Sequence, residues 1–172
     1  MAYFIDFLFL ALIYNTFFYK KWSKDSKKAL ISKTLMYVYV VMVFFVTLMP
    51  VTIPFSGTNN RFMETANFTP FRDLILNYDG ALREIVLNVI MMIPFGIIYP
   101  LIKKKRLMKT VLMTLSFSLF IEISQLLNVW WNGLETRIFD VTDLITNTFG
   151  GLIGYLLLCV LRLLTLNKSK IE

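Results

Sequence analysis

Polar residues whose side chains could bind or react recur at helical spacing near the C-terminal end of the sequence. Asp140, Asp143, Asn147, Gly150 and Gly154 are separated by 3, 4, 3 and 4 residues. On a helix this spacing places all five on one stripe, with the acids first, the amide next and the glycines last. The stripe runs into a long apolar segment, so this helix is expected to enter a membrane. Because hydrocarbon cannot hydrogen-bond acids and amides, we expect the stripe to face protein.

Two other apolar segments carry polar side chains at comparable depth. At ~1.5 Å per residue, Asn88, Glu122 and Asn147 would each lie within roughly 10 Å of the outer end of their helix. An ionised Glu122 at that depth costs several kcal/mol unless it is paired, so we expect it to be protonated, bound to a cation, or paired with an arginine. Arg137 is the nearest arginine in sequence, and Arg72 and Arg83 are the other candidates. These groups predict one polar pocket in the outer leaflet. Its predicted ligand-binding residues are Asn88, Glu122, Gln125, Arg137, Asp140, Asp143 and Asn147.

The elements that must position these residues are membrane helices. The chain has 172 residues, is 57% hydrophobic and has a mean hydropathy of +0.65, which is too apolar for a soluble domain. Apolar runs at 3–19, 34–55, 85–102, 110–127 and 144–164 predict an all-α polytopic bundle of about five transmembrane helices. We expect a single membrane domain over residues 1–172, with an extra N-terminal span in residues 1–30. The first run is the least secure span because Asp6 interrupts it.

The distribution of lysines predicts the direction of the spans. Every lysine falls within 20–33, 103–109 or 168–170. The positive-inside rule then places the N-terminus outside and the C-terminus in the cytoplasm. Segments 56–83 and 128–142 would face outward. The net charge of +7 is explained by this topology, so no nucleic-acid partner is expected.

The outward segment 56–83 contains one periodic stretch. Phe71, Leu74, Ile75 and Tyr78 follow the spacing i, i+3, i+4, i+7, which predicts a short amphipathic helix on the membrane surface. Asp79-Gly80 is typical of a turn before the next span.

The composition also excludes several kinds of chemistry. There is no histidine, which excludes Ser-His-Asp and Cys-His catalytic systems and histidine metal sites. Cys159 is the single cysteine, so no intramolecular disulfide can form. No cofactor and no resident metal are predicted.

Several of the polar positions also have a purely structural interpretation. Asp140 and Asp143 fit an N-cap and the third residue of a helix, where acids interact favourably with the helix dipole. Gly150 and Gly154 fit a helix-packing face, and Asn88 or Gln125 alone could form an interhelical hydrogen bond. Glu122 resists this interpretation best, because a buried acid in mid-span has no capping role.

Four motifs, in order and spacing, resemble the VanZ-like membrane proteins over roughly residues 30–165. They are Asn67-Phe-Thr-Pro-Phe71, the segment 83–96 ending in Pro-Phe-Gly96, Glu122 with Gln125, and the segment 137–154. The resemblance implies a multi-pass protein of the bacterial plasma membrane and cell envelope, in a family named for resistance to the lipoglycopeptide teicoplanin. It assigns no reaction.

Three functions from different classes remain open at this stage. The first is binding or handling of an envelope amphiphile, such as a lipid-linked cell-wall precursor or a lipoglycopeptide, among membrane lipids. The second is an intramembrane enzyme for a lipid-linked substrate, with Glu122 as acid or base and a divalent cation on Asp140 and Asp143. The third is a structural membrane protein whose polar groups only hold the spans together.

Overall fold

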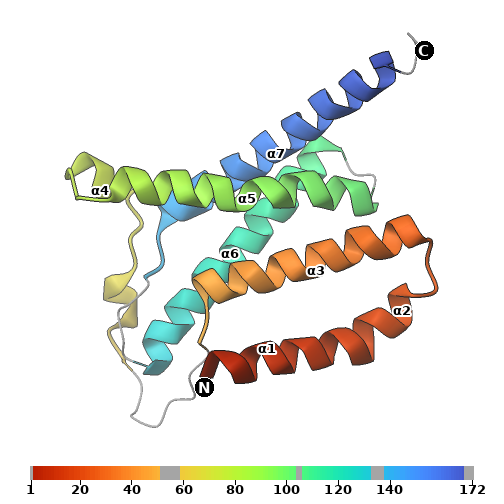
Figure 1. Ribbon diagram of the computed structural model, residues 1–172. Helices are drawn as coiled ribbons and strands as arrows, with labels where there is room; N and C mark the ends of the chain where they lie inside the picture. Colours follow the sequence, from red (N-terminus) through yellow and green to blue (C-terminus); the bar gives the residue numbers. More distant parts are fainter. Residues whose placement is uncertain (1, 51–58, 104–105, 133–137, 169–172) are drawn as a thin grey trace. The chain divides into compact units, whose positions relative to one another are not determined.

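The computed structural model describes residues 2–50, 59–103, 106–132 and 138–168 (Figure 1). These residues are almost entirely helical and include no β-strand; a single bridge pairs Asn67 with Asp140. The helices are α1 (Ala2–Ile13), the π-helix η1 (Tyr14–Tyr19), α2 (Lys20–Trp22), α3 (Lys27–Thr47), the 3-10 helix η2 (Phe62–Thr65), α4 (Arg72–Ile75), α5 (Ala81–Lys103), α6 (Leu107–Asn132) and α7 (Val141–Lys168).

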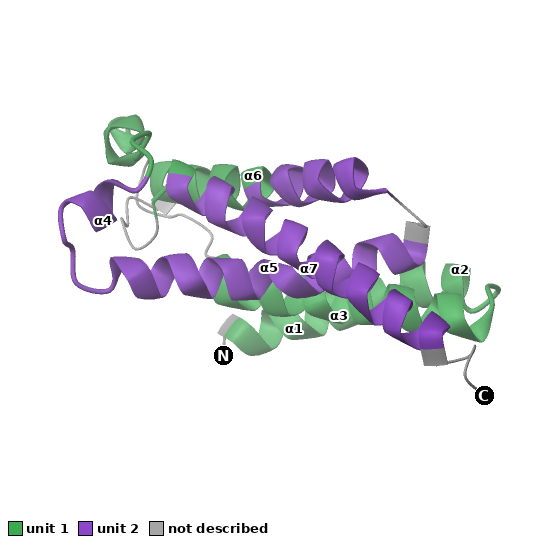
Figure 2. Ribbon diagram, turned by 90° about the horizontal axis from the view of Figure 1, so that it is seen from above, with its two compact units in different colours: residues 1–70, 119–141 green, residues 71–118, 142–172 purple. Residues whose placement is uncertain are grey.

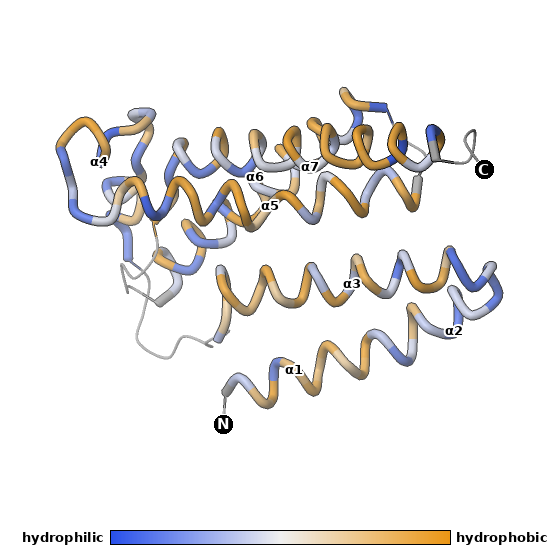
Figure 3. The backbone as a smooth tube through the Cα atoms, turned by 45° about the horizontal axis from the view of Figure 1, so that its top comes forward, coloured by the Kyte–Doolittle hydropathy of each residue, from blue (hydrophilic) through white to orange (hydrophobic). Residues whose placement is uncertain are grey.

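Four of the described helices are long and apolar enough to cross a membrane, namely α3, α5, α6 and α7. Figure 3 colours these helices mostly as hydrophobic. Many of their large apolar side chains are exposed, for example Leu161 and Val38, as expected for helices that face lipid. The all-α polytopic membrane fold is therefore confirmed, while the direction of the spans stays a prediction.

The chain divides into two compact units, which Figure 2 shows in different colours. Unit 1 comprises residues 1–70 and 119–141, and unit 2 comprises residues 71–118 and 142–172. The division falls within α6, so the first part of that helix belongs to unit 2 and the second to unit 1.

In unit 1 the N-terminal helical segment lies antiparallel beside α3 (Figure 1). The Tyr37 hydroxyl donates to the Leu10 carbonyl at 2.7 Å, and the hydroxyls of Tyr14 and Thr34 lie 2.7 Å apart. The Phe45 ring packs on Phe7 near the other end of α3. With 12 residues, α1 alone is too short to span a membrane. The helical path continues without a break through η1 and α2 to Trp22, alongside most of α3.

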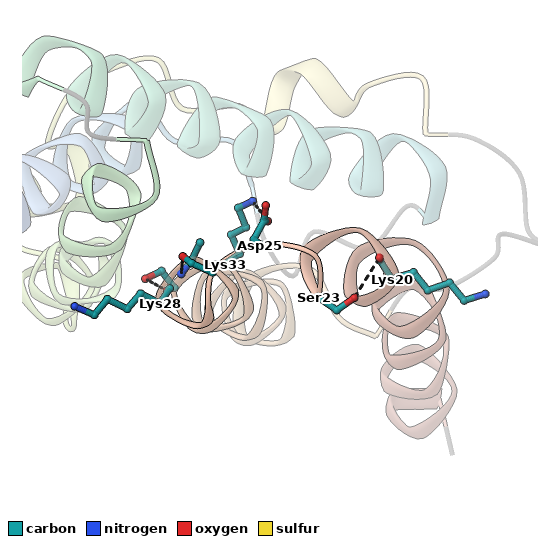
Figure 4. Close-up of polar contacts among 8 residues, drawn as sticks. Lys20, Ser23, Asp25, Lys28 and Lys33 are labelled. Atoms are coloured by element: carbon teal, nitrogen blue, oxygen red, sulfur yellow. Dashed lines mark hydrogen bonds and ion pairs between the residues drawn. The ribbon is translucent and has the colours of Figure 1, made fainter.

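The turn between α2 and α3 carries the first lysine cluster of the sequence. The Lys33 ammonium pairs with the Asp25 carboxylate at 2.6 Å, while the Lys20 and Lys28 side chains extend away from this pair (Figure 4). Ser26 caps α3, its hydroxyl accepting from the Ala29 N–H at 3.3 Å. An exposed, strongly basic turn is what a topology signal requires.

In unit 2 the glycines of α7 bring its backbone against α5. A Cβ atom at Gly150 would collide with the Val89 carbonyl, and one at Gly154 would collide with the Ile93 carbonyl. Backbone atoms cannot move aside as a flexible side chain can, so only glycine fits at these positions. The prediction that Gly150 and Gly154 form a packing face is confirmed.

Only one turn of the helix expected in segment 56–83 is formed, α4, which has 4 residues and leaves Phe71 and Tyr78 outside it. Phe71, with φ 57°, is left-handed directly before this turn. Asn77 and Gly80 also have positive φ values, 53° and 93°, so the chain turns sharply into α5. The predicted turn at Asp79-Gly80 is confirmed.

Candidate functional site

Asn67 joins the segment after η2 to the residue that precedes α7, within unit 1. Its N–H donates to the Phe139 carbonyl at 2.7 Å, and its carbonyl accepts from the Val141 N–H at 3.0 Å. The rings of Phe68 and Phe139 pack against each other at 5.3 Å between centroids. A segment far away in sequence therefore fixes the backbone at the start of α7.

The side chain of Asn67 reinforces this connection. Its Nδ2 donates to Asp140 Oδ2 at 2.8 Å, and its Oδ1 accepts from the Thr69 N–H at 3.1 Å in a local Asx turn. Asn67 is 3% exposed, so both bonds are shielded from water. Asn67 belongs to the motif Asn67–Phe71 but is not among the site residues that the sequence predicts.

Glu122 approaches the same point from α6. Its Oε2 accepts a hydrogen bond of 2.9 Å from the Asp140 N–H, and the residue is 1% exposed. Asp140 itself is half-buried. We call Asn67, Glu122 and Asp140 the Glu122 cluster. Two carboxylates and an amide in a low-dielectric setting are strong acceptors for hydroxyl, amide or ammonium groups, since hydrogen bonds to charged groups exceed neutral ones in strength.

Gln125 lies one turn further along α6 and has a different partner. Its Nε2 donates to the Thr47 carbonyl at 3.4 Å, at the C-terminal end of α3. The last carbonyls of a helix have no partner within the helix, so this long hydrogen bond satisfies one of them. The contact supports a packing role for Gln125.

The remaining predicted site residues form pairs within unit 2. Asn88 Nδ2 on α5 donates to Asp143 Oδ1 in the first turn of α7 at 2.6 Å. Asn147 Nδ2 donates to Ser118 Oγ on α6 at 2.9 Å, and both residues are buried. Thr142, which the sequence analysis also missed, accepts from the Phe71 N–H through its hydroxyl at 2.9 Å. These contacts hold together the helices of unit 2.

The structure thus joins Glu122 to Asp140, and Asn88 to Asp143. Arg137 lies outside the described residues, so its pairing with Glu122 stays a prediction, as does the assembly of all seven residues into one pocket. Among the residues that the structure describes, no three His, Cys, Asp or Glu side chains come together as a metal site would require. This finding gives no support to a divalent cation on Asp140, Asp143 and Glu122.

Comparison with known proteins places the chain among relatives. Residues 34–162 match the family described as VanZ/LLP1, within the region 30–165 that the motifs predict. The chain is similar to Protein VanZ of Enterococcus faecium, with 29% identity over 126 residues, which cover 73% of this chain and 71% of that protein. No solved structure matches the chain. A family match over most of the chain, together with its membrane-spanning helices, shows that this protein is a polytopic membrane protein of the VanZ/LLP1 family.

Proposed function

We propose that this protein acts in the cell envelope, in the bacterial plasma membrane, and confers teicoplanin-type resistance by binding an amphiphile. The ligand class is a lipid-linked cell-wall precursor or a lipoglycopeptide, each of which joins a polar head to a long acyl or prenyl chain. The polar head would meet the Glu122 cluster, and the apolar chain would lie among the lipid-facing side chains. The VanZ/LLP1 family membership supports the phenotype.

The observation that carries the proposal is the burial of Glu122. A carboxyl group that is 1% exposed on a membrane-spanning helix is costly to bury unless it is paired or hydrogen-bonded, and such groups mark binding or reaction sites more often than packing faces. Its hydrogen bond from the Asp140 N–H holds it at the start of α7, beside a second carboxylate that is only half-buried. Asp140 would therefore contact the ligand directly. Glu122 would hold Asp140 in position through the hydrogen bond to its N–H.

The test is a teicoplanin susceptibility assay in a sensitive host, with the parent and variants at matched membrane abundance. We expect Glu122→Gln to abolish protection, because it removes the ionisable carboxyl group but keeps the shape and an oxygen acceptor. Glu84→Gln is the matched control: Glu84 is an exposed acid in the first turn of α5, so its protection should equal that of the parent. Full protection by Glu122→Gln would show that the buried carboxyl group is not needed and would exclude the Glu122 cluster as the functional centre.

A second measurement separates binding from catalysis. Purified parent protein is mixed with a radiolabelled lipid-linked cell-wall precursor, and both the bound and the chemically altered fractions are measured. Saturable binding with unchanged precursor supports the proposal. Conversion of the precursor that depends on Glu122 would instead favour the intramembrane enzyme.

A further inference from the structure

The corner between α4 and α5, in unit 2, contains a hollow of about 740 Å³ that the Glu122 cluster does not use. It is lined by eight of the residues between Leu74 and Val86, and all eight are exposed, so the hollow is shallow and open. Because α5 is a membrane-spanning helix that begins at Ala81, the hollow lies at the level of a membrane surface. An open hollow at this level suits a ligand that itself stays in the membrane.

The residues that line the hollow include both charged and apolar side chains. Asp79 and Arg83 supply one negative and one positive charge, four residues apart across the start of α5. Within the described chain, neither side chain makes an ion pair or a hydrogen bond with another residue, and both are exposed. Two opposite charges that are close in sequence but not paired with each other are available to a ligand that carries both signs.

Three of the lining residues are apolar. They are Leu74, Leu82 and Val86, with exposed fractions of 43%, 64% and 46%. Leucines this exposed at the end of a span favour contact with lipid chains over contact with water. Tyr78, 70% exposed, adds an aromatic ring with a polar tip, the kind of side chain that gathers at membrane interfaces.

The backbone of the corner is held in place before any ligand binds. The Tyr78 N–H donates to the Asp73 carbonyl at 2.8 Å, and the Ala81 N–H donates to the Tyr78 carbonyl at 3.2 Å. The positive φ values of Asn77 and Gly80 fix the direction of the turn. A hollow with a fixed backbone loses less conformational entropy on binding than a flexible loop would.

We propose that this hollow binds one phospholipid whose headgroup carries both a phosphate and a primary ammonium group, as in phosphatidylethanolamine. The Arg83 guanidinium would hold the phosphate, since its planar fork matches phosphate oxygens. The Asp79 carboxylate would accept from the ammonium, and the leucines would contact the first carbons of the acyl chains. A quaternary ammonium headgroup has no N–H to donate, and a purely anionic headgroup would be repelled by Asp79. This site is independent of the proposed resistance function.

The test is native mass spectrometry of the purified full-length protein in detergent micelles. The protein is mixed separately with dioleoyl-phosphatidylethanolamine, dioleoyl-phosphatidylglycerol and dioleoyl-phosphatidylcholine. We expect one phosphatidylethanolamine to be retained, with roughly tenfold preference over each of the other two, which corresponds to one charged hydrogen bond. Equal retention of the three lipids would overturn the proposal.

Variants of the two charges assign the headgroup contacts. Arg83→Gln should lower retention of phosphatidylethanolamine roughly tenfold. Asp79→Asn should remove the preference over phosphatidylglycerol. Glu84→Gln is the control, because Glu84 neighbours Arg83 and is exposed but does not line the hollow, so its lipid retention should match the parent. Parent-like retention in Arg83→Gln would refute the site, and because resistance is not measured here, that result would leave the proposed function untouched.

Discussion

Buried polar groups occur in both units of this membrane protein, but their surroundings differ. In unit 1 the Glu122 cluster brings two carboxylates and an amide together where a loop meets the end of a helix. In unit 2 the pairs Asn88–Asp143 and Asn147–Ser118 connect one helix to another. The glycines of α7 add close backbone contacts with α5. Asp143 in unit 2 is half-buried, as Asp140 is, but among the described residues only unit 1 adds a fully buried acid, Glu122. Pairwise contacts suit helix association, whereas a buried acid grouped with a second acid and an amide suits a ligand.

Under the proposed function, the polar groups of unit 1 serve ligand binding, whereas those of unit 2 hold helices together. Changes in unit 2 are expected to lower stability and, at matched abundance, to leave resistance intact. Isosteric changes in unit 1, such as Glu122→Gln, are expected to lower resistance and to leave stability intact. The following predictions test this division, from the largest expected effect to the smallest.

The largest effect is expected from a side chain at Gly150 in unit 2. Gly150→Leu would drive a side chain into the Val89 backbone, which can only move if α5 and α7 separate. We expect a loss of about 3 kcal/mol or more, in the range of severe overpacking. The yield of monodisperse protein after size-exclusion chromatography in detergent would fall accordingly.

The neighbouring residue Phe149 provides the control for this prediction. Its side chain is 53% exposed, so Phe149→Leu should leave the yield unchanged. A Gly150→Leu protein that purifies and melts like the parent would show that the close approach of α5 and α7 is not needed for folding.

The next largest effect is expected in unit 1, from Asn67→Ala. This change removes the bond to the Asp140 carboxylate and the Asx turn with Thr69, so we expect a loss of about 3 kcal/mol. Because Asn67 also holds Asp140 beside Glu122, resistance should fall even at matched abundance. Unchanged resistance with lowered stability would assign Asn67 to packing alone.

A smaller effect is expected from two substitutions of Glu122, one that keeps an acceptor for the Asp140 N–H and one that removes it. Glu122→Ala leaves the Asp140 N–H without this acceptor, whereas Glu122→Gln can still accept from it. We expect the free energy of unfolding of Glu122→Ala to be lower by about 1–2 kcal/mol than that of Glu122→Gln. Thermal unfolding of the two purified variants in the same detergent measures this difference. Equal stabilities would mean that the Asp140 N–H finds another acceptor.

The sequence predicts the spans well, because long apolar runs leave few alternatives for a backbone in lipid. It also predicts the tight packing of Gly150 and Gly154, since small residues at four-residue spacing allow close helix contact. It fails where a distant segment decides the outcome. Nothing in the helical pattern near Asp140 shows that Asn67 would bind it, 73 residues away. Likewise, left-handed residues on both sides, Phe71 and Asn77, confine α4 to a single turn although the apolar spacing favours a longer helix.

The seven predicted site residues illustrate the same limit. Periodicity identifies Asn88, Glu122 and Asp143 as side chains that avoid lipid, but it does not choose their partners. The pairing of Asn88 with Asp143, and of Glu122 with the Asp140 backbone, depends on helix rotation within each unit. A side-chain acceptor for a backbone N–H just before a helix has no signature in composition or spacing.

The smallest expected effect concerns Asn147, whose two amide atoms behave differently. Its Nδ2 donates to Ser118 Oγ, but within the described residues its buried Oδ1 has no hydrogen-bond partner. A buried acceptor without a partner lowers the net cost of Asn147→Ala, but it cancels from a double-mutant cycle. A cycle of Asn147→Ala and Ser118→Ala should give a coupling of about 0.6 kcal/mol, the average for such bonds in membranes. The cycle for Asn88 and Asp143 should exceed it, because a carboxylate is the acceptor there. If the Asn147 cycle gave the larger coupling, or if Asn147→Ala abolished resistance at matched abundance, unit 2 would contain functional polar groups, and the division between the two units would no longer hold.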